Sequence, residues 1–261
     1  MELWQVVVFG IIEGVTEFLP VSSTGHLILT AKILNLFQSE FLKSFEIAIQ
    51  LGAIFSVAML YWRSLLIDRK MFAKVMAAFL PTAVLGTLFY KFIKSFLFAR
   101  ESIIVIALFA GGVILVIFEF FYKEKPGSSS STTNITFKQA FIIGTCQALA
   151  MIPGVSRSLA TILAGLSMGL QRKTIVQFSF LLAIPTMLCA TAFDLTKSAA
   201  NFTWMQLQHL TVGFIVSFLV AFVVVRTFVR YVEKNNFIAF GIYRIMIALL
   251  LVALVKMNIL K

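Results

Sequence analysis

Long apolar runs separated by short polar segments dominate the pattern of residues along the chain. A helix that crosses a membrane needs about 20 mostly apolar residues. Six runs are long enough, at positions 45–62, 71–90, 102–122, 175–195, 210–229 and 237–256. The pattern therefore predicts an all-α polytopic membrane protein with six transmembrane helices.

Two further apolar runs are interrupted by polar, helix-breaking residues. The run at 3–19 stops at Pro20 and an SSTG sequence, and it resumes only over 27–37. The run at 137–152 stops at PGVSRS and resumes over 159–170. At about 1.5 Å per residue, the second arm of each run, which is the apolar segment after the interruption, covers only about half of the hydrocarbon thickness. We therefore predict two re-entrant hairpins, each made of a helix, a break and a short helix.

The two interrupted runs are similar to each other. GIIEGVTEFLPVSSTGH ends at His26, and GTCQALAMIPGVSRSLAT begins at Gly144. Both have a glycine, then Glu13 or Gln147 three residues later, then a proline and a serine-rich break. Three predicted spans follow each run, and this odd number would insert the second unit upside down. Inverted repeats of this kind place a site between discontinuous helices near the middle of the membrane.

The predicted domain organisation follows from this repeat. The chain forms one membrane domain, divided into a first repeat (1–122), a polar linker (123–136) and a second, inverted repeat (137–261). More Lys and Arg residues fall in the loops opposite the termini than in those beside them. This asymmetry favours termini outside the cytoplasm.

Composition agrees with a membrane location. The chain has 261 residues, of which 60% are hydrophobic and 13% charged, and its mean hydropathy is +0.99. These values exclude an ordinary soluble globular protein. We interpret the net charge of +11 as basic loops facing anionic lipid, not as a nucleic-acid surface. Cys146 and Cys189 lie in apolar surroundings, so we expect packing residues and no disulfide or metal framework.

The two breaks concentrate polar groups where lipid cannot satisfy them. Irregular backbone at membrane depth is tolerated only when it is buried in protein or lines a watery cavity, so we expect the breaks to face each other. A short helix that begins after Ser23 would direct free N–H groups at the break, where they attract phosphate. Arg157 would add a planar, positively charged guanidinium suited to phosphate oxygens. The predicted phosphate-binding residues are Ser22, Thr24 and Gly25 in the first break and Gly154, Ser156 and Ser158 in the second.

The first break also carries the parts of an acid–base site. Glu13 and Glu17 are four residues apart, so they share one face of a helix and repel each other when both are ionised. A divalent metal ion, Mg²⁺ or Ca²⁺, would balance both carboxylates and bind a substrate phosphate. Ser23 or a neighbouring hydroxyl would supply a nucleophile, and His26 would transfer a proton. These groups favour phosphoryl transfer.

Each of these residues also has a structural interpretation. Ser and Thr after a proline are typical helix caps, a lone His in a membrane helix often makes an interhelical hydrogen bond, and Arg157 could be a snorkelling anchor. The occurrence of all these residues together in the two breaks favours a catalytic site over separate structural roles. Four other polar residues have lower weight, with interhelical pairing as the alternative: Glu46, Gln50, Asp194 and Arg244. Gln147 is a further candidate of lower weight.

Four motifs carry a resemblance to a known family. They are EGVTEFLPVSSTGH (13–26), FEIAIQLGAI (45–54), PGVSRSLATI (153–162) and FLLAIPTMLCATAFDL (180–195). In these motifs and over nearly its whole length, the chain resembles the bacterial undecaprenyl-diphosphate phosphatases, also called bacitracin-resistance proteins. The resemblance implies a hydrolase that converts undecaprenyl diphosphate to undecaprenyl phosphate, recycling the lipid carrier for cell-wall synthesis and conferring bacitracin resistance. It also implies a divalent cation, a homodimer, and a multi-pass location in the bacterial inner membrane with a site that opens to the extracytoplasmic side.

The resemblance assigns roles to individual residues. The catalytic set is Glu17, Ser23, His26 and Arg157, the metal pair is Glu13 and Glu17, and the second phosphate-binding motif contains Ser156, Arg157 and Thr161. The second run has Gln147 and Met151 where the first has its acidic residues, so acidic chemistry is confined to the first half. Attack by Ser23 and attack by an activated water both stay open. The alternative function is an inverted-repeat transporter or flippase of an anion or lipid phosphate, which needs no nucleophile.

Overall fold

The computed structural model describes residues 1–37, 39–92, 101–124, 134–195 and 202–256, and within these ranges it contains helices and no strands. The α-helices are α1 (Leu3–Thr16), α2 (Ser23–Ile33), α3 (Glu40–Leu66), α4 (Arg69–Phe92), α5 (Glu101–Phe121), α6 (Phe137–Gln147), α7 (Arg157–Ser167), α8 (Arg172–Leu195), α9 (Trp204–Val232) and α10 (Ile238–Lys256), with a short 3₁₀ helix η3 (Ala148–Met151) after α6. The prediction of an all-α protein is confirmed. Most of the predicted linker, 125–133, lies outside the described residues.

Several helices are long and apolar enough to cross a membrane. In the described part of the chain these are α3, α4, α5, α8 and α9, so the prediction of a polytopic membrane protein is confirmed. α10 covers the sixth predicted span, but its stretch Ile238–Leu254 counts among the shorter apolar helices. The number of six spans therefore stays a prediction.

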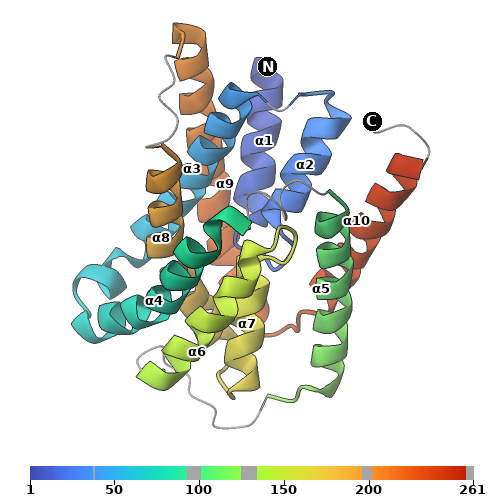
Figure 1. The fold of residues 1–261 in the computed structure, drawn as a ribbon. Coiled ribbons are helices and arrows are strands. Elements are labelled where there is room, and N and C mark those ends of the chain that lie inside the picture. Colours follow the sequence, from blue (N-terminus) through green and yellow to red (C-terminus); the bar gives the residue numbers. More distant parts are fainter. Residues whose placement is uncertain (38, 93–100, 125–133, 196–201, 257–261) are drawn as a thin grey trace.

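The two interrupted runs fold as a helix, a break and a short helix, as predicted. α1 and α6 begin at Leu3 and Phe137, and α2 and α7 begin at Ser23 and Arg157. The spacing between the two starts is the same in both units. In Figure 1 the pair α1 and α2 enters from one end of the molecule, the pair α6 and α7 enters from the other, and the breaks lie near the middle.

The backbone of the two units also matches in its unusual positions. Ser22 and Ser156, the N-caps of α2 and α7, have φ of 68° and 77°. Asn35 and Gly169, just beyond the ends of the same helices, have φ of 51° and 79°. Positive φ is uncommon for residues other than glycine. Its recurrence at matching positions shows that both short helices are entered and left in the same way.

Each first arm packs closely on a long helix from the other half of the chain. α1 lies against α9, where a Cβ at Gly10 would come within 3.0 Å of the carbonyl oxygen of Gly213. α6 lies against α4, where a Cβ at Gly144 would collide with the backbone of Ala78. The absence of a side chain permits both approaches. These contacts hold the two breaks in the interior.

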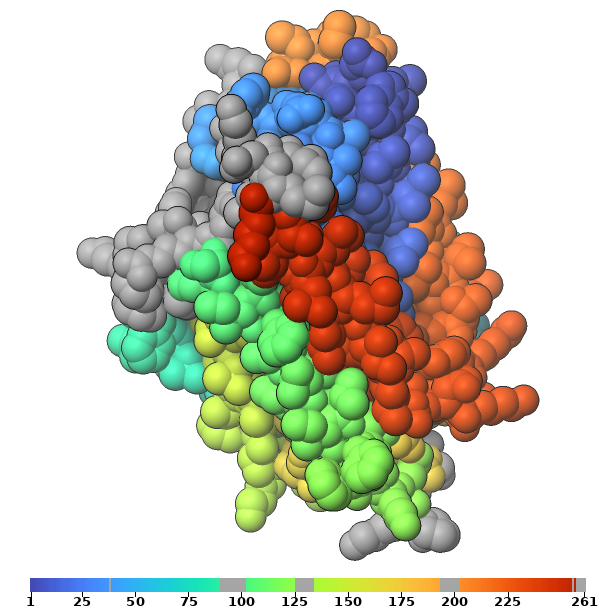
Figure 2. All heavy atoms as spheres, turned by 90° about the vertical axis from the view of Figure 1, so that its right-hand side faces the viewer, coloured from blue at the N-terminus to red at the C-terminus, as the bar shows by residue number. Residues whose placement is uncertain are grey.

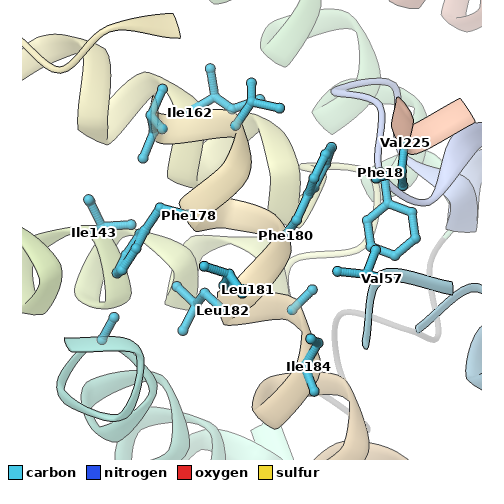
Figure 3. Packing of buried hydrophobic residues seen from close by; sticks show 14 of the residues in the cluster. Phe18, Val57, Ile143, Ile162, Phe178, Phe180, Leu181, Leu182, Ile184 and Val225 are labelled. Atoms are coloured by element: carbon cyan, nitrogen blue, oxygen red, sulfur yellow. The ribbon is translucent and has the colours of Figure 1, made fainter. Parts of the chain in front are cut away.

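The largest apolar cluster surrounds α8. Phe178, Phe180, Leu181 and Leu182 are buried there, and Phe18 of the first break packs edge-on against Phe180 with ring centroids 5.3 Å apart (Figure 3). Between helices in lipid, close packing replaces exclusion of water as the main source of association. The cluster therefore fixes the first break against α8. On another face of the molecule, α5 and α10 lie side by side (Figures 1 and 2).

Candidate active site

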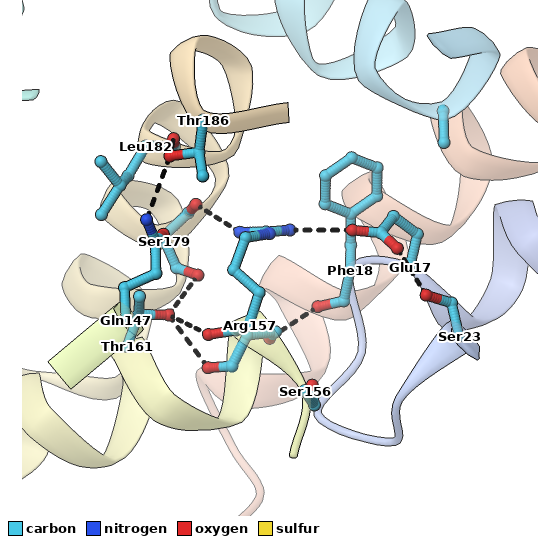
Figure 4. Close-up of polar contacts among 12 residues, drawn as sticks. Glu17, Phe18, Ser23, Gln147, Ser156, Arg157, Thr161, Ser179, Leu182 and Thr186 are labelled. Atoms are coloured by element: carbon cyan, nitrogen blue, oxygen red, sulfur yellow. Dashed lines mark hydrogen bonds and ion pairs between the residues drawn. The ribbon is translucent and has the colours of Figure 1, made fainter. Parts of the chain in front are cut away.

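The two breaks face each other, as the pattern predicts. Arg157 Nη2 lies 3.4 Å from Glu17 Oε1, and both side chains are nearly buried. Next to this ion pair, Ser158 Oγ donates a hydrogen bond of 2.9 Å to the carbonyl oxygen of Phe18 (Figure 4). The two halves of the chain therefore meet through a charged contact and a neutral one.

Glu17 lies between a hydroxyl and a cation. Its Oε1 faces Arg157, and its Oε2 accepts a hydrogen bond of 2.6 Å from Ser23 Oγ (Figure 4). This length is typical of a hydroxyl that donates to an ionised carboxylate. A hydroxyl held on a base in this way is the arrangement that activates a serine nucleophile. The predicted catalytic residues Glu17, Ser23 and Arg157 thus form one continuous chain of contacts.

The guanidinium of Arg157 is held in a fixed orientation. Nη1 donates to the carbonyl oxygen of Ser179 at 2.9 Å, and the group lies over the ring of Phe18, 5.7 Å from its centroid. Nε is buried and has no hydrogen-bond partner among the described residues. One N–H of Arg157 is thus unsatisfied within the described ranges.

Glu13 lies one turn before Glu17 on α1. It is almost fully buried, and its Oε2 has no hydrogen-bond partner within the described ranges. Glu17 and Glu46 of α3 are close enough to interact with it electrostatically, while Gln50 lies one turn beyond Glu46 and is half-buried. Carboxylates grouped at membrane depth are costly unless they are protonated or share a cation.

The acidic residues fit a metal ion only in part. No group of three or more His, Cys, Asp or Glu side chains in the described chain is arranged to hold a metal. The unpartnered oxygen of Glu13 and the adjacent Glu17 supply the one or two carboxylates that Mg²⁺ usually takes from a protein, with phosphate oxygens and water as its other ligands. The residues therefore fit a metal that binds together with a phosphate substrate.

The matching position in the second half is neutral. Gln147 Nε2 donates to Thr82 Oγ1 at 3.1 Å and to Thr186 Oγ1 at 3.0 Å. The amide is buried and contacts α4 through Thr82 and α8 through Thr186, which Figure 4 shows beside it. In this half the residue serves helix packing, and the acidic chemistry is confined to the first break.

The hydroxyls of the second break are used within the protein. Ser156 caps α7 by accepting the N–H of Leu159 at 3.3 Å. Thr161 Oγ1 lies 2.6 Å from Ser179 Oγ, and Thr161 and Ser158 are fully buried. These three residues shape the wall that holds Arg157, and their binding of phosphate stays a prediction.

The first break and its glycine lie against α5. Ser22 and Ser23 are buried, while Thr24, in the first turn of α2, is half-buried. A Cβ at Gly25 would lie 2.8 Å from Leu108 Cδ1, and one at Gly154 would lie 2.5 Å from the carbonyl oxygen of Ile104. The close approach at both glycines is to α5, and their binding of phosphate stays a prediction.

Arg244 of α10, to which the sequence pattern gives low weight with interhelical pairing as the alternative, contacts both breaks. It is completely buried and donates to the carbonyl oxygens of two residues of α5 and of one residue in each break. The acceptors and distances are Leu108 (3.3 Å), Ala107 (3.1 Å), Pro20 (3.1 Å) and Gly154 (2.8 Å). Arg244 therefore ties both breaks to the same face of α5. The sequence feature that points to Arg244 is an arginine within an otherwise apolar helix.

His26 is directed away from the ion pair. Its Nδ1 lies 2.8 Å from the carbonyl oxygen of Ser22, and its Nε2 lies 2.8 Å from Tyr243 Oη. The predicted proton-transfer residue thus contacts α10 and not Ser23. Nothing in the sequence pattern marks Tyr243, because a half-exposed tyrosine is common in membrane helices.

Comparison with known proteins covers nearly the whole chain. The family model described as bacitracin resistance protein BacA matches residues 6–250. A relative from Aquifex aeolicus, named undecaprenyl-diphosphatase, is 48% identical over 253 residues, which is 97% of this chain and 98% of the relative. Relatives with the same name from Sulfurihydrogenibium and Wolinella succinogenes are 44% and 45% identical over 250 residues, covering 96% of this chain and 98% and 97% of theirs. The matched region includes both breaks and α5.

Proposed function

The chain belongs to the bacitracin resistance protein BacA family, and from this premise we propose that it is an undecaprenyl-diphosphate phosphatase. It hydrolyses undecaprenyl diphosphate to undecaprenyl phosphate and inorganic phosphate, which recycles the lipid carrier for cell-wall synthesis and confers bacitracin resistance. The observation that carries the proposal is the chain of contacts from Ser23 through Glu17 to Arg157 across the two breaks. These contacts support a nucleophile, a base and an anion-binding cation in one buried site.

The reaction follows from the roles of these groups. The free Nε–H of Arg157 and the N–H groups at the start of α2 bind the terminal phosphate. Glu17 takes the proton of Ser23 or of a water molecule as the oxygen attacks the terminal phosphorus, and the bond to the bridging oxygen breaks. Undecaprenyl phosphate leaves with that bond's electron pair. If Ser23 attacks, water then hydrolyses the phosphoserine and releases inorganic phosphate.

A divalent cation, Mg²⁺ or Ca²⁺, completes the proposed site. Glu13 and Glu17 would hold it, and the unpartnered oxygen of Glu13 supports this assignment. When bound, the ion would neutralise charge on the phosphates. Glu46 interacts electrostatically with Glu13 and would complete the polar surroundings of the ion.

The finer architecture in this proposal is an inverted repeat of six transmembrane helices and two re-entrant hairpins. The matching positive φ angles at Ser22 and Ser156 support it, as does the crossed packing of α1 on α9 and of α6 on α4. The two repeats are residues 1–122 and 137–261. The resemblance to the family supports a homodimer in the bacterial inner membrane, with the site open to the extracytoplasmic side.

Phosphate release by the purified protein in detergent tests the activity. We expect release from undecaprenyl or farnesyl diphosphate that depends on added Mg²⁺ or Ca²⁺ and stops with a chelator. Glu17→Gln should lower turnover by about 10³-fold, as for loss of a group acting in the transition state. Glu233→Gln, which changes an exposed glutamate at the end of α9, should retain wild-type turnover. No release under any metal condition would overturn the proposal and favour the transporter alternative.

A further inference from the structure

We infer that Tyr243 positions His26 and is the group through which His26 exchanges its proton. The inference rests on the proposed function, because it concerns proton transfer in the same site. Three features carry it: the hydrogen bonds of the two ring nitrogens of His26, the burial of His26, and the place of Tyr243 at the outside of the molecule.

The hydrogen bonds of His26 determine its tautomer. Nδ1 lies 2.8 Å from the Ser22 carbonyl oxygen, and a carbonyl oxygen can only accept, so Nδ1 carries a hydrogen. In the neutral ring the lone pair is then on Nε2, which lies 2.8 Å from Tyr243 Oη. Tyr243 therefore donates to neutral His26. When the ring is protonated, Nε2–H donates to the phenolic oxygen, and the hydroxyl hydrogen of Tyr243 is free to bind another acceptor.

The hydrogen bond to Tyr243 connects the buried His26 to the outer surface of the protein. It is 7% exposed, whereas Tyr243 is 41% exposed and belongs to α10, which runs along the outer face beside α5 (Figure 2). The two rings are almost parallel, 8° apart in orientation. Arg244 is a charged group near His26, and it donates four hydrogen bonds to backbone carbonyls. Tyr243 Oη is thus the atom through which a proton can enter or leave Nε2.

The transfer is balanced in atoms and charge. A water molecule takes the hydroxyl proton of Tyr243, and Tyr243 Oη takes the Nε2 proton of the imidazolium. One O–H and one N–H bond break and two O–H bonds form. His26 ends neutral, and the reverse sequence restores its charge.

Removal of the hydroxyl tests this role. Tyr243→Phe keeps the stacked ring and should lower kcat by about 100-fold, the lower range for loss of acid–base assistance, with KM nearly unchanged. Tyr231→Phe is the matched control. Tyr231 lies at the end of α9, where it packs edge-on against Phe240 and not against His26. It should keep wild-type kcat. Wild-type kcat in Tyr243→Phe, or a change in KM alone, would overturn the inference.

A double variant separates action through His26 from a general structural effect. His26→Gln and the combined His26→Gln, Tyr243→Phe protein should turn over at the same rate, because residues that act as one unit give non-additive losses. If the combined loss equals the product of the single losses, Tyr243 does not act through His26.

Nitrogen NMR of the imidazole gives a readout that needs no turnover. The chain has two histidines, and His209→Gln identifies the signals of His26. The wild-type protein should show the Nδ1–H tautomer, with an Nε2 signal that moves in Tyr243→Phe and stays in Tyr231→Phe. An Nε2–H tautomer in the wild type overturns the inference even if Tyr243→Phe does not fold. Absence of phosphate release together with the expected spectra would instead reject the proposed function and leave the positioning of His26 intact.

Discussion

The break between α1 and α2 and the break between α6 and α7 have nearly the same backbone and very different side chains. Ser22 and Ser156 enter their short helices with φ of 68° and 77°. Beyond this shared geometry, the first break contains carboxylates and a hydroxyl held on one of them, and the second contains a neutral amide and an arginine. The backbone supplies two similar helix N-termini, and the side chains supply opposite charges.

This difference shows why one active site needs both halves of the chain. Two acidic breaks would repel each other at membrane depth, and two basic breaks would have no base to activate a nucleophile. With Glu17 on one side and Arg157 on the other, the charges balance across 3.4 Å, and Arg157 supplies the cation that an anionic substrate requires. The comparison predicts that variants at matching positions of the two breaks will have unequal effects.

The largest effect is expected at the cation of the second break. Arg157→Ala should lower kcat/KM for undecaprenyl diphosphate by about 10³-fold or more, because it removes phosphate stabilisation and leaves Glu17 as an uncompensated buried charge. Arg157→Lys keeps the charge but not the planar guanidinium, so its kcat/KM should lie between those of the wild type and Arg157→Ala. Phosphate release under saturating metal measures both. Arg226→Ala, which removes an exposed arginine of α9, is the control, and equal activity of Arg157→Ala and this control would contradict the comparison.

The next largest effect is expected at the residue that ties the two breaks together. Arg244→Met should lower kcat/KM by about 100-fold, since a misplacement of about 1 Å can cost that much. It should also lower the melting temperature, because carbonyl oxygens in both breaks lose their donor at about 1–3 kcal/mol for each group left unsatisfied. Arg230→Met, at an exposed position of α9, should change neither quantity. Loss of activity without loss of stability would show that Arg244 contacts substrate directly.

Much of this site follows from local sequence. Pro20 and the serine-rich segments after both prolines predict where the first arms end, and the need to bury irregular backbone predicts that the breaks face each other. These features depend on residues close together in the chain or on a general rule about membranes. The direct ion pair of Glu17 with Arg157 is not predicted, because the sequence pattern assigns Glu17 to a metal ion and Arg157 to a phosphate.

The remaining contacts depend on helices that are distant in sequence. Arg244 and Tyr243 lie in the last helix, and no periodicity in α10 shows that it will lie over the first break. The sequence pattern predicts that Gly25 binds phosphate, but its close approach to Leu108 depends on the position of α5. The hydroxyls of Ser158 and Thr161 are similar cases, because their partners Phe18 and Ser179 lie in other elements.

A smaller effect is expected at the second carboxylate of the first break. Glu13→Gln should raise the concentration of Mg²⁺ needed for half-maximal activity by about 10-fold or more, a loss typical for weakened metal sites. Its melting temperature should not fall, because the variant removes a charge whose Oε2 has no hydrogen-bond partner in the described chain and is therefore costly to bury. Titration of phosphate release with Mg²⁺ measures the shift. An unchanged metal requirement would remove Glu13 from the proposed metal pair.

The smallest effect is expected at the matching amide of the second break, and it gives the sharpest contrast with Glu13. Gln147→Leu should leave kcat/KM and the metal requirement at their wild-type values. Thr82 and Thr186 still donate to the carbonyl oxygens of Gly144 and Leu182 at 2.6 and 2.8 Å, so the free energy of unfolding should change by no more than about 1 kcal/mol. Denaturant unfolding and the same Mg²⁺ titration measure the two quantities. If Gln147→Leu shifted the Mg²⁺ requirement as much as Glu13→Gln does, both breaks would take part in metal binding. The similar backbone of the two breaks would then serve the same function in both halves.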